Sequence, residues 1–309
     1  MTDEREKSEL YRRLTLVRKC AEKIMAVYLS DVMQTPVHLS VGQESIATAL
    51  CYCLNGRDFK IGTHRSHALY LSNGGDVRAF FAELLGRKTG CSGGMGGSMH
   101  LIDTANGLVG TTSIVGGCLP ILPGLAMACE KPQVAAALFG DGACDEGALA
   151  ESLNWSALKK LPAIFLCENN RYSVYTPFGQ RRAARPIELA KAFGLAWLDV
   201  PIEQSSDVFA LAELLAGPIE RVRQREGPLF VECQTVRALD HSGVRDDVSA
   251  GLRPAEEKQL FETYDPMKVA RTRMNSAQCD QIDAQVAQQV ELAYQQALAD
   301  EPATWEAKL

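Results

Sequence analysis

Continuous apolar runs alternate with helix-like segments through the second half of the chain, and this alternation constrains the fold more than any other feature. The runs lack the apolar–polar alternation of a strand that is exposed on one face. Strands buried on both faces are typical of parallel sheets, because the crossover helices cover both sides. We therefore expect an α/β fold, a parallel sheet with helices on both faces. The expected strands are residues 133–140, 163–168, 196–200 and 228–236, and the expected helices are 145–160, 187–194 and 207–224.

Helical patterns also precede the alternating region. Residues 4–30 carry apolar side chains at three-to-four spacing, which predicts a long amphipathic helix at the start of the chain. Residues 44–54 and 76–86 predict two further helices, the second with Asp76 as its N-cap.

A glycine-rich segment, residues 90–124, lies between these helices and the alternating region. A long loop inside a compact domain is usually functional, and we expect this one to be irregular but ordered. Residues 254–309 predict a helical tail that packs on the core or on a partner. The sequence shows neither a repeat nor a clear linker, so we expect a single domain over residues 1–309.

Composition and charge narrow the class of protein. The chain has 309 residues, 46% hydrophobic and 23% charged, with a net charge of −6, so we expect a globular protein that binds no nucleic acid. No apolar run is long enough to span a bilayer, and the charged first residues do not resemble a signal peptide. The ten cysteines lie mostly in apolar or helical runs, which predicts free thiols. We therefore expect a cytoplasmic protein with no membrane association.

Short oxygen-bearing side chains follow two consecutive strands of the expected sheet. Asp141 stands between two glycines at the end of one strand, and Asn170 follows the end of the next. Ligands bind at the carboxyl edge of a parallel sheet, and a carboxylate, an amide oxygen and a backbone carbonyl suit Mg²⁺. Either motif alone is more often a turn or a loop. Together, after neighbouring strands, they favour a site for a metal ion and a phosphate.

With these residues in view, the chain resembles a known family, the α subunits of thiamine-diphosphate-dependent 2-oxo acid dehydrogenase E1 components. That family includes the pyruvate, branched-chain and acetoin enzymes. The resemblance runs from residue 10 to residue 260, and it implies a thiamine-diphosphate-binding fold. The motifs that carry it are GDGACDEG at 140–147 with ENNRY at 168–172, HLSVGQES at 38–45, THRSH at 63–67, ELLGRKTGCSGGMGGSMH at 83–100 and SIVGGCLP at 113–120.

The resemblance implies roles for individual residues around the cofactor. The side chains of Asp141 and Asn170 and the carbonyl of Tyr172 would bind Mg²⁺. The residues expected to bind thiamine diphosphate are His64, Arg65, Ser113, Val115, Asp141, Gly142, Ala143, Asn170, Tyr172 and His241.

Three histidines are the expected catalytic residues. By resemblance, His38 faces the 2-oxo acid, His64 reaches the diphosphate, and His241 lies near the reacting part of the cofactor and assists acyl transfer. A histidine can serve as acid or base because its ordinary pKa lies near neutrality. Without the resemblance, these histidines are ordinary core, cap or loop residues.

The resemblance also implies a reaction and partners. The expected function is Mg²⁺-dependent decarboxylation of a 2-oxo acid, or cleavage of an acyloin, with transfer of the acyl or enamine unit to a lipoyl acceptor. The chain would act with an E1 β-like subunit in an α₂β₂ heterotetramer, which supplies a glutamate that this chain lacks, and possibly with a lipoyl acyltransferase E2. The alternatives are a carboligase that uses an aldehyde or ketone acceptor, and a scaffold relative without catalysis.

Three departures from the family pattern bear on the choice of acceptor. The motif GDGACDEG places Asp145 and Glu146 where the family has uncharged residues, and GGMGGSMH lacks the family's lysines. In RALDHSGVRDD, Leu239 replaces a histidine of the pyruvate enzymes and Asp240 replaces a glycine. These changes suit an acceptor other than a lipoyl group.

Overall fold

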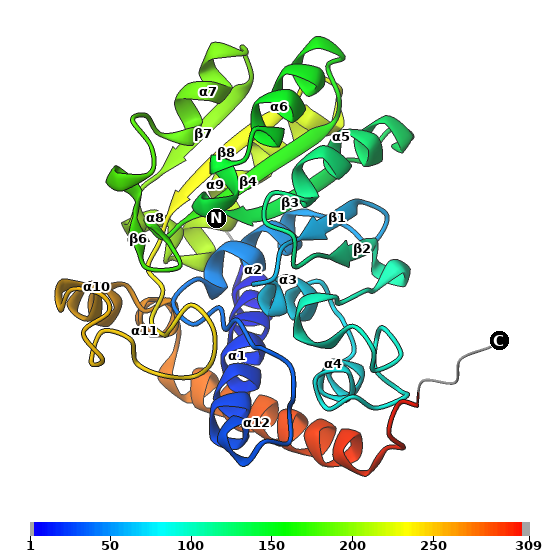
Figure 1. Ribbon diagram of the computed structural model, residues 1–309, viewed down its shortest axis with the longest axis vertical. Helices are drawn as coiled ribbons and strands as arrows, with labels where there is room; N and C mark the ends of the chain where they lie inside the picture. The colour runs from blue at the N-terminus through cyan, green and yellow to red at the C-terminus, as the bar shows by residue number, and fades with distance from the viewer. Residues whose placement is uncertain (1–2, 305–309) are drawn as a thin grey trace.

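Six parallel strands form the central sheet of the computed structural model, which describes residues 3–304 (Figure 1). The strand order is β2-β1-β3-β4-β8-β7, so the chain starts next to one edge, adds β2 as that edge, and then crosses to β3, β4 and the other edge, β7, before β8 enters between β4 and β7. The expected α/β fold with a parallel sheet is confirmed. A separate hairpin, β5 (Tyr172–Ser173) with β6 (Thr176–Pro177), follows β4. The sheet strands are β1 (Phe59–Gly62), β2 (Leu108–Thr111), β3 (Ala135–Gly140), β4 (Ala163–Asn169), β7 (Ala196–Val200) and β8 (Leu229–Gln234).

Alternate residues of the central strands enter two separate hydrophobic cores, because successive side chains of a strand point to opposite faces. In β4, Ile164 and Leu166 belong to the larger core, and Phe165 and Cys167 belong to the smaller one. Buried residues on both faces explain why these strands read as continuous apolar runs. Figure 1 shows α5, α6 and α7 on one side of the sheet and α1, α2 and α12 on the other.

The helices differ modestly from their expected bounds. The N-terminal helix ends at Val27, followed by a 3₁₀ turn (Tyr28–Ser30), and a capping box between Asp3 and Glu6 starts it. Asp76 is the N-cap of α4, as predicted. The α-helices are α1 (Glu4–Val27), α2 (Glu44–Cys53), α3 (His67–Ser72), α4 (Val77–Leu84), α5 (Cys118–Ala128), α6 (Ala148–Leu158), α7 (Pro186–Ala192), α8 (Ile202–Ser205), α9 (Val208–Arg223), α10 (Glu256–Tyr264), α11 (Pro266–Thr272) and α12 (Ser276–Ala299).

The glycine-rich segment is more regular than predicted. It contains β2 and the start of α5, although α5 includes Pro120 and Pro123. A proline in the first turn of a helix costs little, because the amide it lacks has no partner inside the helix there. Buried apolar residues of α5 pack on the sheet and stabilise the helix despite Pro123.

The predicted helical tail is present in residues up to 299, as α10, α11 and α12. Ile282, Val286 and Val290 form the buried face of α12, which packs along α1 and α4. The last residues of the predicted tail, 305–309, lie outside the described part of the chain. Across residues 3–304, we find no helix with the length and apolar character needed to cross a bilayer.

The carboxyl ends of the strands meet at one edge of the sheet, since all of them run the same way. Residues 63–65 follow β1, Asp141 follows β3, Asn170 follows β4, and the segment that carries His241 follows β8. The fold therefore brings the predicted site residues toward one edge from four separate strands.

Candidate active site

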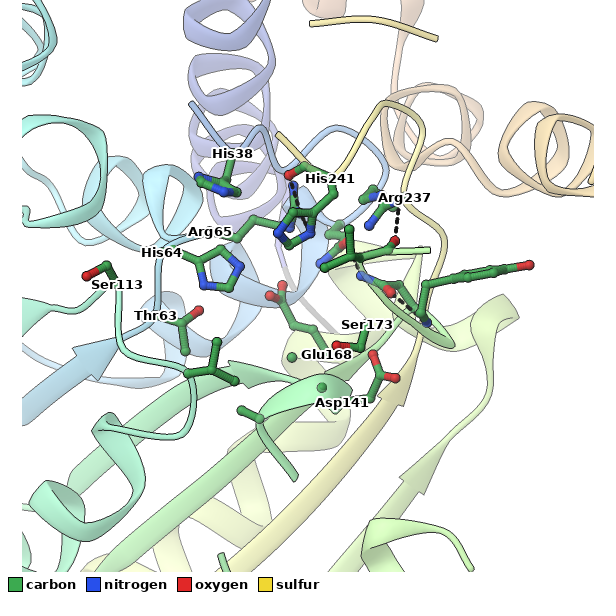
Figure 2. Close-up of a pocket in the computed structure, with 18 of the residues that line it drawn as sticks. His38, Thr63, His64, Arg65, Ser113, Asp141, Glu168, Ser173, Arg237 and His241 are labelled. Atoms are coloured by element: carbon green, nitrogen blue, oxygen red, sulfur yellow. Dashed lines mark hydrogen bonds between the residues drawn. The ribbon is translucent and has the colours of Figure 1, made fainter. Parts of the chain in front are cut away.

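One cavity at the carboxyl edge of the sheet is lined by every residue that the sequence predicts for the site (Figure 2). Its volume is about 850 Å³ when the open space at its mouth is included. Figure 2 shows the imidazoles of His38, His64 and His241 grouped on one side, and Asp141 with Ser173 on the other. The predicted residues that line the cavity are His38, His64, Arg65, Ser113, Val115, Asp141, Gly142, Ala143, Asn170, Tyr172 and His241.

Asp141 has the features of a metal ligand. Its side chain is 1% exposed, and among the described residues its Oδ1 atom has no hydrogen-bond partner. A buried acceptor without a partner is costly, and a cation would satisfy it. Burial raises the pKa of this carboxyl to about 6, although Arg181 opposes the shift. The other expected metal ligands, the amide oxygen of Asn170 and the carbonyl of Tyr172, are also oxygen atoms, which suit Mg²⁺ rather than a softer ion.

Arg181 contacts the same carboxylate. Its guanidinium lies 2.5 Å from Oδ2 of Asp141 and also pairs with Asp145. A metal ion at Asp141 would therefore share this carboxylate with Arg181 or displace it toward Asp145. Asp145 adds a negative charge to the family's motif, and Arg181 forms an ion pair with it.

The turn after β4 brings Asn170 and the backbone of Tyr172 together. Oδ1 of Asn170 accepts from the amide of Tyr172 at 3.1 Å, and Nδ2 donates to Gln43 at 3.0 Å. The amide oxygen keeps a second lone pair for another partner. Val174, two residues further on, lines the cavity with φ of 54°. A β-branched residue rarely adopts this conformation, and such strain concentrates at functional sites.

Gly142 lies close against Ser173. A Cβ atom there would lie 2.9 Å from Oγ of Ser173. Gly142 and Ala143 lie in the 3₁₀ turn η4 (Asp141–Asp145), which precedes α6. Their amides and the open cavity beside them fit a phosphate, so the residues present fit both parts of a metal–diphosphate group.

The three histidines form a tight cluster. The ring centroids of His38 and His64 are 4.7 Å apart, and those of His38 and His241 are 5.2 Å apart. Burial lowers the pKa of His38 to about 2, of His64 to about 3 and of His241 to about 4, and the positive charge of Arg65 adds to each shift. All three imidazoles are therefore neutral at pH 7.

The cluster could offer ring nitrogens to a metal, since these atoms lie within 4.8 Å of one another. The charge of Arg65 argues against a cation there. Nη2 of Arg65 lies 3.4 Å from Nδ1 of His241 and donates to the carbonyl of His241 at 2.9 Å. Neutral histidines beside a buried guanidinium suit an anion, such as a carboxylate.

The whole sequence agrees with one protein family. The model of that family, described as dehydrogenase E1 component, matches residues 12–306. The chain belongs to this family. The rat testis-specific pyruvate dehydrogenase E1 component subunit alpha (Rattus norvegicus) is 35% identical over 94% of this chain and 75% of that protein. The human somatic form (Homo sapiens) is 34% identical over the same shares. The chloroplast subunit alpha-3 of rice (Oryza sativa subsp. japonica) is 35% identical over 84% of this chain and 63% of that protein.

Two expectations for this E1 chain are decided by these comparisons. The resemblance to E1 α subunits and the class of thiamine-diphosphate-dependent oxidoreductase are confirmed. The predicted cytoplasmic location is wrong on this comparison, because the relatives are mitochondrial or chloroplast proteins. Composition and free thiols did not discriminate between these compartments.

Eight further residues of the E1 chain line the cavity and were not predicted as site residues: Gln43, Thr63, Met99, Gly140, Glu168, Ser173, Val174 and Arg237. Glu168 is fully buried, and burial raises its pKa to about 8. Its position could have been predicted, because Glu168 stands near the carboxyl end of β4, directly before Asn169 and Asn170. The place of Arg237 in the cavity could not be predicted from the sequence, because its contacts, Val174 and Asp247, lie on separate loops.

Arg65 is less free than the resemblance implies. It is 6% exposed, and its two terminal nitrogens donate to the carbonyls of Leu39 and His241. It lines the cavity but also fixes two loops. Contact between Arg65 and the diphosphate stays a prediction.

Acid is expected to destabilise the E1 chain through its buried histidines. Burial first, and then Arg65, lowers the pKa of His67 to about 3. Below pH 6.5 the unfolded chain takes up a proton that the folded chain does not, so the free energy of unfolding falls as pH falls. From His67 alone we expect a loss of about 2 kcal/mol between pH 6.5 and pH 5.

Urea unfolding of the wild type and of His67→Gln at both pH values measures this contribution. The variant should lose less stability than the wild type over the same interval, whatever its stability at pH 7. Equal losses would contradict the neutral, buried state of His67.

Proposed function

We propose that this chain is the α subunit of a thiamine diphosphate- and Mg²⁺-dependent enzyme that decarboxylates a 2-oxo acid, or cleaves an acyloin, and passes the acyl unit to a lipoyl group. The observation that carries the proposal is one cavity that is lined by Asp141, whose Oδ1 atom has no partner among the described residues, by Asn170 and by three neutral histidines. The names of the relatives point to pyruvate as the first substrate to try.

The proposed metal and cofactor site divides into two parts. Asp141, Asn170 and the carbonyl of Tyr172 would hold Mg²⁺, and the amides of Gly142 and Ala143 would hold the diphosphate. Bound thiamine diphosphate supplies an electron sink for cleavage of the bond beside a carbonyl. Ser113 and Val115, on the loop before α5, would contact its aminopyrimidine ring.

The three histidines of the cluster would contact the substrate. His38, His64 and His241 are neutral at pH 7, so each ring offers the substrate one N–H donor and one acceptor nitrogen. Arg65 beneath them favours the carboxylate of a 2-oxo acid. The buried surroundings strengthen both effects, because charge interactions are stronger away from water.

Exposed apolar side chains beside the cavity support a partner subunit. Val115, which lines the cavity, is 46% exposed, and its neighbour Ile114 is 66% exposed. A partner that covers this region would also close the mouth of the cavity. We propose that the partner is an E1 β-like subunit in an α₂β₂ heterotetramer, and that a lipoyl acyltransferase E2 receives the product.

A second candidate function is carboligation, in which an aldehyde or ketone accepts the two-carbon unit. Leu239 and Asp240 favour it, because they replace a histidine and a glycine of the pyruvate enzymes in the loop that carries His241. That change alters the loop beside the cavity, which a lipoyl group would have to pass.

An assay of the chain together with its β-like subunit separates these functions. The assembly receives thiamine diphosphate, Mg²⁺ and pyruvate, and then either a lipoyl domain or a small aldehyde. We expect release of carbon dioxide with reductive acylation of the lipoyl domain. Product with the aldehyde alone would favour carboligation, and failure of the assembly to bind thiamine diphosphate would favour a scaffold role.

A further inference from the structure

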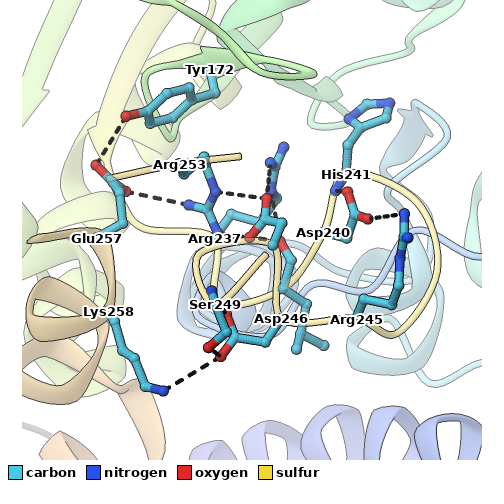
Figure 3. Close-up of polar contacts among 12 residues, drawn as sticks. Tyr172, Arg237, Asp240, His241, Arg245, Asp246, Ser249, Arg253, Glu257 and Lys258 are labelled. Atoms are coloured by element: carbon cyan, nitrogen blue, oxygen red, sulfur yellow. Dashed lines mark hydrogen bonds and ion pairs between the residues drawn. The ribbon is translucent and has the colours of Figure 1, made fainter. Parts of the chain in front are cut away.

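The loop that carries His241 is irregular from residue 235 to residue 255, apart from a one-residue bridge between Gly243 and His38. A loop of this length needs specific contacts to hold a side chain in one place. Buried ion pairs anchor its base. Arg237 and Arg253 both pair with Asp247, and Arg253 also reaches Glu257 (Figure 3).

Asp240 holds the part of the loop next to His241. Its side chain is 2% exposed, and its Oδ1 atom accepts the amide of His241 at 2.6 Å and the hydroxyl of Tyr175 at 2.5 Å. Its Oδ2 atom accepts from Arg245 at 3.1 Å. One carboxylate therefore joins His241 to the turn between β5 and β6.

Residue 241 is held at both ends of its backbone. Asp240 binds its amide, and Nη2 of Arg65 binds its carbonyl at 2.9 Å. These two contacts fix the backbone from which the imidazole projects, and the ring lies with its centroid 5.2 and 5.4 Å from those of His38 and His64. Figure 3 shows Asp240 directly below His241, with Arg245 on its outer side.

We propose that Asp240 is a positioning residue, which holds His241 in the histidine cluster before any ligand binds. The pyruvate enzymes that this chain resembles have a glycine at this place, and a glycine offers no such acceptor. A catalytic role for His241 rests on the proposed function. Its placement by Asp240 does not.

The contact with His241 matters more than the ion pair with Arg245. The side chain of Arg245 is 72% exposed, and such pairs contribute little to stability. The Oδ1 atom, by contrast, accepts from two donors at once, the amide of His241 and the hydroxyl of Tyr175. An asparagine keeps that acceptor and loses the charge, whereas an alanine loses both.

NMR titration of the full chain without cofactor tests this assignment. The chain has five histidines, so the ring signals of ¹³C-labelled histidine can be followed individually. The groups that face His241 are His38, His64, Arg65, Arg237 and Asp240. In the wild type we expect His241 to titrate with a pKa of about 4.

In Asp240→Ala, the pKa of His241 should rise toward 6.5, and the ring signals of His38 and His64 should shift as His241 leaves them. In Asp240→Asn, His241 should stay beside His38 and His64 with a pKa no higher than in the wild type, because asparagine keeps the acceptor and loses the charge that raises this pKa. In the matched control Arg245→Gln, His241 should titrate as in the wild type. A wild-type titration in Asp240→Ala overturns the proposal, and so does an Asp240→Asn variant that behaves like Asp240→Ala.

Tyr175→Phe keeps the test decisive if Asp240→Ala does not fold. This variant removes one of the two donors to Oδ1 and leaves Asp240 in place. We expect an upward shift of the His241 pKa that is smaller than full release would give; an unchanged pKa overturns the proposal. Because no cofactor is present, neither result depends on the proposed reaction.

Discussion

Asp141→Ala is expected to abolish magnesium-dependent binding of thiamine diphosphate, with an affinity at least about a hundredfold below that of the wild type. The wild-type carboxylate is buried, and its Oδ1 atom lacks a partner among the described residues. Alanine removes the one charged ligand of the proposed ion, and the diphosphate would then meet no counterion at that point. Calorimetric titration with and without Mg²⁺ measures the effect.

Asp145→Ala is the matched control. Asp145 also pairs with Arg181, but its side chain is 28% exposed and it does not line the cavity. This variant should bind the cofactor much as the wild type does, and both variants should keep the wild-type circular dichroism. If Asp141→Ala holds the cofactor as tightly as the wild type, the metal assignment is wrong.

His241→Ala is expected to slow turnover about 10²- to 10⁴-fold, the range typical of a lost general acid or base. Binding of thiamine diphosphate should change little, because the metal and diphosphate contacts lie on other loops. His241 is neutral at pH 7, with Arg65 beside it and the cavity in front. Steady-state kinetics of the assembly with its β-like subunit measure kcat and KM separately.

A fall in kcat with little change in cofactor affinity would support a role for His241 in the chemical steps. His38→Ala is the comparison. By resemblance His38 faces the substrate, so this variant should raise KM as well as lower kcat. Normal turnover in His241→Ala would remove this histidine from the mechanism.

The sheet could be predicted where strands are buried on both faces. The runs at 135–140, 163–169 and 229–234 are mostly apolar, so their burial can be predicted from the local sequence alone. β1 and β2 were missed because they are four residues each and include a lysine or a glycine. They form strands because a neighbouring strand pairs with them, and such pairing is not visible locally.

The site was predictable to a similar extent. Asp141 and Asn170 stand out because each follows a strand end, whereas the histidines were selected by resemblance alone. The contacts of Arg181 and Asp240 could not be predicted. Their partners Asp141 and Tyr175 lie far along the chain, and the fold alone decides which side chains meet.

The most direct test of the account is a crystal structure with thiamine diphosphate and Mn²⁺ in place of Mg²⁺, because the anomalous signal of manganese locates the ion. We predict one peak in the cavity, coordinated by the side chains of Asp141 and Asn170, the carbonyl of Tyr172 and the diphosphate. A diphosphate bound elsewhere, or an ion held by His38, His64 and His241 instead, would contradict it.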